Sequence, residues 1–141
     1  IKAMGITQED VYFTSIIKSK SVSNILLQKG NNSSELIEKK VFIEYLKKEL
    51  SLINPSIIIS FGELSYILLT NKSLEKEEFN QIRGQLFKFS EHPVVPTFNP
   101  SYLLLKDSLE TKRYFWEDLL IVMNELELEI TQKQKKYFQK Q

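Results

Sequence analysis

The chain has 141 residues, 42% of them hydrophobic, which suits one folded domain with a core and excludes a disordered polar chain. Nineteen lysine and arginine residues against eighteen acidic ones leave a net charge of +1, so any nucleic-acid-binding surface must be local. The chain has no cysteine and one histidine, His92, which excludes disulfides, cysteine-ligated clusters and histidine-based metal sites within it.

No hydrophobic run approaches the length of about 18 residues that a membrane-spanning helix needs, and the first residues do not resemble a secretory signal. We therefore expect a soluble, cytoplasmic protein with no membrane partner. The residue types present also predict no metal and no cofactor.

The first part of the chain predicts a strand, a loop and a helix. Residues 1–5 have the pattern of a helix end that stops at Gly5. Residues 10–17 are rich in β-branched and aromatic side chains and predict a buried strand. The polar residues of 18–34 indicate a surface loop, and 35–53 predict a helix. The apolar stripe expected on that helix comprises Ile37, Val41, Phe42, Tyr45, Leu46, Leu50 and Ile53.

The second part alternates strands with helices. Residues 56–61 predict a buried strand, followed by Gly62 and a helix over 63–70. Residues 71–81 are polar and indicate a loop, and 83–89 alternate like a half-exposed strand.

A short apolar run then ends at Thr97 and is followed by the turn Asn99-Pro100-Ser101, a helix start and a last helix over 108–129. Asn99 and Ser101 are thus expected at the carboxyl end of a strand, the edge where open α/β sheets bind ligands. The C-terminal residues 131–141 carry four lysines and no acidic residue.

These elements predict the α/β class, as a three-layer α/β/α sandwich with a mostly parallel central sheet of about four strands. We expect one domain over residues 1–130 and a basic C-terminal tail over 131–141.

Four segments of the chain occur in an order that resembles a known family. They are residues 11–19, residues 53–62, Arg83-Gly84 with residues 95–104, and residues 116–119. Together they are similar to the conserved motifs of uracil-DNA glycosylases of the iron–sulfur type, and the resemblance implies the fold of that superfamily. The family's first strand, which ends in a Gly-Glu-x-Pro-Gly type motif and is central in its sheet, has no counterpart here.

The resemblance also marks where this chain departs from the family. Asn99 falls at the catalytic histidine, and Ser15 at the asparagine that reads the uracil edge. Ser19 and about Phe42 fall at cluster cysteines, and Leu105 at a closing arginine. The mismatch-specific uracil/thymine branch resembles this chain in having Asn-Pro-Ser at the histidine's place, so Asn99 is still a candidate hydrogen-bond donor.

These correspondences define the candidate site. Asn99 is the candidate catalytic residue, and Ser15, Asn99 and Ser101 are the expected base pocket. The residues expected to contact nucleic acid are Lys18, Lys20, Ser101 and Lys106, through charge or hydroxyl contacts to phosphate.

Three functions are open on these residues. The first is a degenerate glycosylase-like domain that binds DNA, or a replication or repair protein, without breaking a bond. The second is an active divergent glycosylase that excises a damaged, uracil-like base, with its water-activating group on a segment upstream of Ile1. The third is a module for protein interaction alone, as the same fold provides in a clamp-loader accessory subunit.

Overall fold

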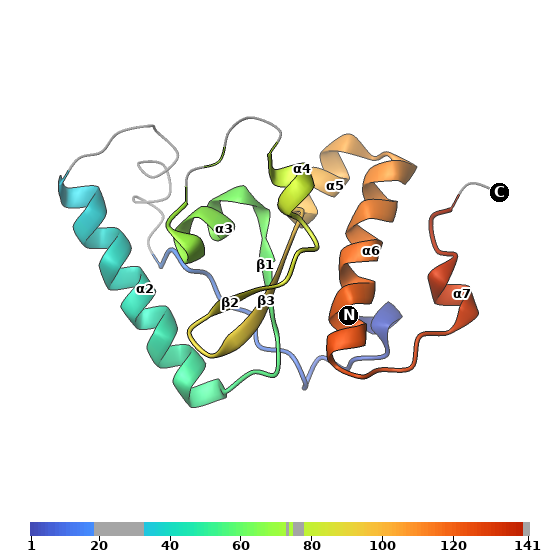
Figure 1. Cartoon of the computed structure of the whole chain (residues 1–141), viewed down its shortest axis with the longest axis horizontal. Helices are drawn as coiled ribbons and strands as arrows, with labels where there is room; N and C mark the ends of the chain where they lie inside the picture. The colour runs from blue at the N-terminus through green and yellow to red at the C-terminus, as the bar shows by residue number, and fades with distance from the viewer. Residues whose placement is uncertain (19–32, 73, 75–77, 140–141) are drawn as a thin grey trace.

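The computed structural model describes residues 1–18, 33–72, 74 and 78–139, with side chains in the first long helix described from Lys39 onward. Figure 1 shows a sheet in the middle of the molecule, with helix α2 (Ser33–Ile53) at the left and helix α6 (Leu109–Glu125) at the right. Helices therefore flank a small sheet, as expected from the alternation of strands and helices.

The sheet has three strands in the described residues, in the order β1 (Ile58–Phe61), β3 (His92–Thr97), β2 (Phe87–Phe89). β1 pairs with β3 in parallel, and β2 pairs with β3 antiparallel. The fold is thus mixed α/β with a mixed sheet, whereas we expected about four mostly parallel strands.

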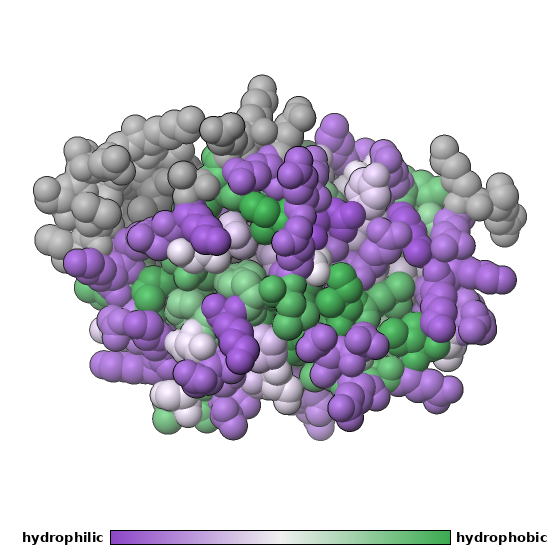
Figure 2. All heavy atoms as spheres, viewed as in Figure 1, coloured by the Kyte–Doolittle hydropathy of each residue, from purple (hydrophilic) through white to green (hydrophobic). Residues whose placement is uncertain are grey.

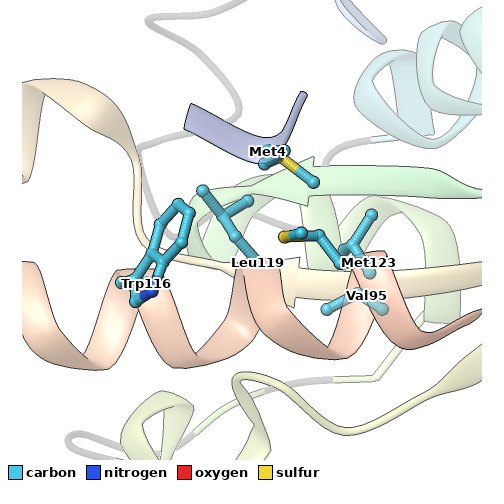
Figure 3. Close-up of a cluster of buried hydrophobic side chains, with 6 residues drawn as sticks. Met4, Val95, Trp116, Leu119 and Met123 are labelled. Carbon is cyan, nitrogen blue, oxygen red and sulfur yellow. The ribbon is translucent and has the colours of Figure 1, made fainter. Parts of the chain in front are cut away.

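Alternate residues of the strands face opposite layers, as a pleated strand requires. Val94 of β3 packs with Leu46 and Leu50 of α2, whereas its neighbour Val95 packs with α6. Figure 3 shows Val95 beside Met123 of α6, with Leu119 and Trp116 further along the same helix and Met4 from the N-terminal helix η1 (Lys2–Met4) above them. In Figure 2, hydrophobic side chains gather across the middle of the molecule, and hydrophilic ones cover most of its periphery.

Four shorter helices complete the described fold: α3 (Gly62–Thr70), α4 (Phe79–Ile82), α5 (Pro100–Lys106) and α7 (Gln132–Lys135). The helices expected over 35–53 and 63–70 are confirmed, and the last long helix starts as expected after its Ser108 cap but ends at Glu125. α4 lies within the segment predicted to be a loop. No helix in the described ranges has the length and apolar character needed to cross a membrane.

The strand predicted over residues 10–17 is wrong. These residues form no strand, and the side chains of Tyr12 and Phe13 are exposed. The segment is attached instead to α2, where Thr14 and Lys18 hydrogen-bond to Glu49. A composition typical of strands does not by itself provide a neighbouring strand to pair with. In the described residues β1, at the edge of the sheet, pairs with β3 and not with residues 10–17.

The apolar stripe predicted on α2 is only partly buried. Leu46 and Leu50 lie in the core, whereas Val41, Tyr45 and Ile53 are exposed. The helix carries apolar residues on two faces, and helical periodicity alone does not tell which face the sheet covers.

Part of the basic C-terminal stretch packs against α6. The Trp116 indole donates a hydrogen bond to the Gln134 carbonyl at 2.7 Å, and the Arg113 guanidinium donates to the carbonyls of Lys135 and Tyr137. The Gln134 side chain in turn donates to the carbonyl of Ala3 at 2.9 Å.

A buried carboxylate ties the end of β3 to α6. Asp118, 1% exposed, accepts hydrogen bonds from Thr97 Oγ1 at 2.6 Å and from the Arg83 guanidinium at 2.5 Å. The following residue, Gly84, donates its backbone N–H to the Pro96 carbonyl at 2.7 Å. Arg83 therefore binds the carboxylate of Asp118, and Gly84 binds the backbone of β3.

We predict that Gly84→Ala destabilises the protein much more than Gly5→Ala. Both glycines have a positive φ, of 73° and 79°, so both variants carry the left-handed penalty of about 1–2 kcal/mol. A Cβ at Gly84 would lie 2.6 Å from Asp118 Oδ1, whereas one at Gly5 meets no atom within 4 Å. We expect a further loss of about 1–3 kcal/mol for Gly84→Ala, measured by urea unfolding. Equal losses for the two variants would contradict this account.

Candidate functional site

A cavity of about 690 Å³ opens at the carboxyl ends of β1 and β3. Its wall combines the segment before α2, the junction of β1 with α3, and the junction of β3 with α5. The lining residues are 15–17, 61–65, 98 and 99, with Leu68, Phe79, Asn80 and Tyr102. The cavity is therefore at the sheet edge where the sequence placed the ligand site.

Asn99 is fixed in this cavity by its place at the start of α5. It caps the helix, and its Oδ1 accepts hydrogen bonds from the backbone N–H of Ser101 at 3.0 Å and from the Ser101 hydroxyl at 2.8 Å. A backbone N–H needs an acceptor, so these contacts fix which way the amide points. The Nδ2 group, which has no hydrogen bond within the described residues, is the donor that Asn99 can offer to a ligand.

Gly62 forms the wall next to Asn99. Its φ of 82° favours glycine, and a Cβ there would lie 3.4 Å from Asn99 Cβ and 3.8 Å from Asn99 Nδ2. The start of α3 therefore lies next to the side chain of Asn99, and a side chain at position 62 would be in van der Waals contact with it.

The two serines of the expected base pocket have different surroundings. Ser15 lines the cavity, but its hydroxyl donates to the Ile17 carbonyl at 2.9 Å. Ser101 does not line the cavity, and its hydroxyl donates a hydrogen bond to Asn99 Oδ1. The structure thus brings Ser15 and Asn99 together and makes Ser101 a positioning partner.

The lysines expected to contact nucleic acid also differ. Lys18 forms an ion pair with Glu49 at 2.8 Å, and the hydrogen bond from Lys18 is the main cause that lowers the pKa of this glutamate. Lys106 is exposed in the last turn of α5, with no ion pair to another described residue. Lys20 lies outside the described residues. Within the described part, Lys106 is therefore the candidate whose charge is most available.

The role of Asp118 could not be derived from the sequence. Its motif and the Arg83-Gly84 pair contributed only to the resemblance, and their meeting in space was not expected. Burial raises the pKa of Asp118 to about 6, although the Thr97 hydrogen bond and the Arg83 charge act in the opposite direction. Thr97 lies two residues before Asn99. By binding Thr97, the Asp118 carboxyl therefore fixes the end of β3 from which Asn99 follows.

We predict that the stabilising contribution of Asp118 declines as the pH rises from about 4 to about 6. The pKa of an aspartate in the unfolded chain is about 3.9, and that of Asp118 in the folded protein is about 6. Between these values the folded state holds more protons, so the free energy of unfolding falls with rising pH, by about 1–3 kcal/mol in total.

The measurement is urea unfolding of the wild type and of Asp118→Asn, which does not titrate, at a series of pH values. The wild-type stability minus that of the variant should fall across this window and be level above it. A difference that rises or stays level between pH 4 and 6 would refute the prediction.

Residues 1–120 match the model of a protein family described as the Uracil DNA glycosylase superfamily. The chain is 27% identical over 121 residues to the type-4 uracil-DNA glycosylase of Thermotoga maritima, which is 84% of this chain and 58% of that protein. It is 26% identical over 106 residues to the type-4 enzyme of Saccharolobus solfataricus, or 72% of this chain and 46% of that protein.

A protein named DNA polymerase from Bacillus phage SP01 is also similar, with 30% identity over 119 residues. The match covers 84% of this chain but 12% of the phage protein. The chain thus spans about half the length of the two glycosylases and a small part of the polymerase.

Proposed function

Because this chain belongs to the uracil DNA glycosylase superfamily, we propose that it is a non-catalytic member that binds DNA at the edge of the cavity. The observation that carries this proposal is the state of Asn99. Asn99 lines the cavity, at the position where the resemblance places the family's catalytic histidine. It is a neutral amide, and its oxygen accepts hydrogen bonds from Ser101.

Several further losses support the absence of glycosylase chemistry. A donor aimed at the charge that develops on a leaving base is worth roughly 3–4 kcal/mol, and Asn99 offers only its Nδ2 group. The Ser15 hydroxyl is engaged by the Ile17 carbonyl. An iron–sulfur cluster does not fit this chain, because it has no cysteine and the half-buried Phe42 falls at one ligand position.

The surface beside the cavity supports binding of DNA. Leu104 and Leu105 of α5 are 82% and 85% exposed, and Lys106 follows them. Exposed apolar side chains of this kind can insert between base steps, and a neighbouring lysine can contact phosphate. The similarity to a phage protein named DNA polymerase supports a place in a larger protein that handles DNA.

We predict that Lys106→Ala weakens the binding of a fluorescent single-stranded oligonucleotide at low salt about two- to fivefold. The logarithmic salt dependence should decrease by about 0.7, since one phosphate contact is lost. Lys88→Ala is the control, because Lys88 is exposed on β2 opposite Pro93, at the far end of the sheet from Asn99. No binding by the wild type, or equal losses in the two variants, would reject the proposal.

The alternative is an active, divergent glycosylase, and a separate assay distinguishes it. Duplexes with uracil, hypoxanthine or a thymine mismatch are incubated with the protein, and abasic sites are then cleaved with alkali. We expect no nicked strands. Nicking that is abolished in Asn99→Ala would establish the active alternative, whatever the affinity for DNA.

A further proposal concerns the free side of β1. This strand pairs with β3 alone in the described residues, and its carboxyl end shares the cavity with residues 15–17. We infer that an additional strand, supplied upstream of Ile1, lies parallel to β1 between it and residues 10–17. Such a strand would cover the exposed rings of Tyr12 and Phe13, and the longer chains of the related glycosylases support it.

Hydrogen exchange tests this arrangement by comparing residues 1–141 with the protein that includes the encoded upstream residues. We expect the amides of Ile58–Phe61 that do not bond to β3, and those of residues 12–16 that face the added strand, to exchange at least about tenfold more slowly in the longer protein, because a strand ladder protects them. Amides of β3, already paired on both sides, serve as the internal control. Unchanged exchange at β1 would rule out the added strand.

A further inference from the structure

Helix α2 has a second apolar face that the domain does not cover. Its inner face places Leu46 and Leu50 in the core. On the opposite side, Val41, Tyr45 and Leu52 are 45%, 57% and 86% exposed. At about 100° per residue these three side chains fall within roughly 40° of one another, so they form one line along the helix, here named the outer stripe.

An exposed line of large apolar side chains on a helix is the form in which proteins present a docking site for another helix. α2 lies at the left edge of the molecule in Figure 1, with the sheet on its other side. The outer stripe is therefore turned away from the core, and a partner bound there would leave Asn99 and the cavity free.

Charged residues border the outer stripe on both sides, and its acidic neighbours Glu44 and Glu49 are already paired, with Lys47 and Lys18. Lys48 lies within the stripe, with its Nζ 6.0 Å from the centre of the Tyr45 ring. Lys40 and Lys47 lie along one side, and Glu44 is paired with Lys47 at 2.8 Å. Lys40 and Lys48 form no ion pair with a carboxylate in the described part of the chain, so the stripe has an uncompensated positive border.

We propose that the outer stripe binds an amphipathic helix whose apolar positions are flanked by acidic residues. Such a helix would place its apolar side chains on Val41, Tyr45 and Leu52 and its carboxylates near Lys40 and Lys48. A second copy of this chain is a poor occupant, because pairing two outer stripes would bring lysines against lysines. The proposal does not depend on DNA binding at the cavity.

The test uses a synthetic helical peptide of leucine, alanine and glutamate, with leucines at positions i, i+4, i+7 and i+11 and glutamates beside them. A second peptide with lysine in place of every glutamate has the same apolar stripe. We expect the acidic peptide to bind the whole chain at least about tenfold more tightly than the basic one in calorimetric titrations, because only the acidic one complements the lysines.

Variants locate the binding site. Tyr45→Ser with Leu52→Ser should weaken binding of the acidic peptide at least about tenfold, since it removes the apolar contacts. Leu86→Ser is the control, an exposed apolar residue before β2. Circular dichroism checks that all variants are folded.

Three results would overturn the proposal: equal affinity for the two peptides, equal affinity of the stripe variant and the wild type, or displacement of the peptide by duplex DNA. Sedimentation provides a fourth. A dimer that the stripe variant abolishes would assign the stripe to self-association instead.

Discussion

The hydrogen bonds of Asp118 are the interaction on which the rest of the candidate site depends. This buried carboxylate joins Thr97, at the end of β3, to Arg83. Arg83 and Asp118 are 35 positions apart in the sequence. Removing one partner of such a group leaves the other without compensation in the interior, which commonly costs 3–5 kcal/mol. Asn99 follows Thr97 by two residues, so the hydrogen bonds of Asp118 also determine where Asn99 lies relative to α6. Arg83-Gly84 and residues 116–119, which both contribute to the family resemblance, thus meet in one network of hydrogen bonds.

The cavity shows that the frame of a site and its chemistry are separate properties. Ser101 holds the side chain of Asn99 and Gly62 lies beside it, and nothing in that geometry requires a reactive group. The left-handed Gly62 and the capping contacts of Asn99 serve the packing of α3 and α5 as much as any ligand. The shape of the cavity alone is therefore weak evidence of activity.

Features set by local chemistry were predictable, and features set by long-range contacts were not. The turn at Asn99-Pro100-Ser101 has its own cap, so its position at the end of a strand followed from three residues. Residues 10–17 have the composition of a strand, but a strand needs a neighbour, and sequence composition does not supply one. The buried face of α2 and the ion pair that occupies Lys18 also depend on residues distant in the chain. The contact of Arg83 with Asp118 is likewise a long-range contact that the sequence did not predict.

The hydrogen bond from Gln134 to the Ala3 carbonyl makes two segments far apart in the sequence depend on each other. It joins helix η1 to the residues that follow Thr131, and both segments also contact α6, through Met4 and through the side chains of Trp116 and Arg113. A change that loosens either segment therefore removes part of the support of the other, so we expect the two to detach from α6 together.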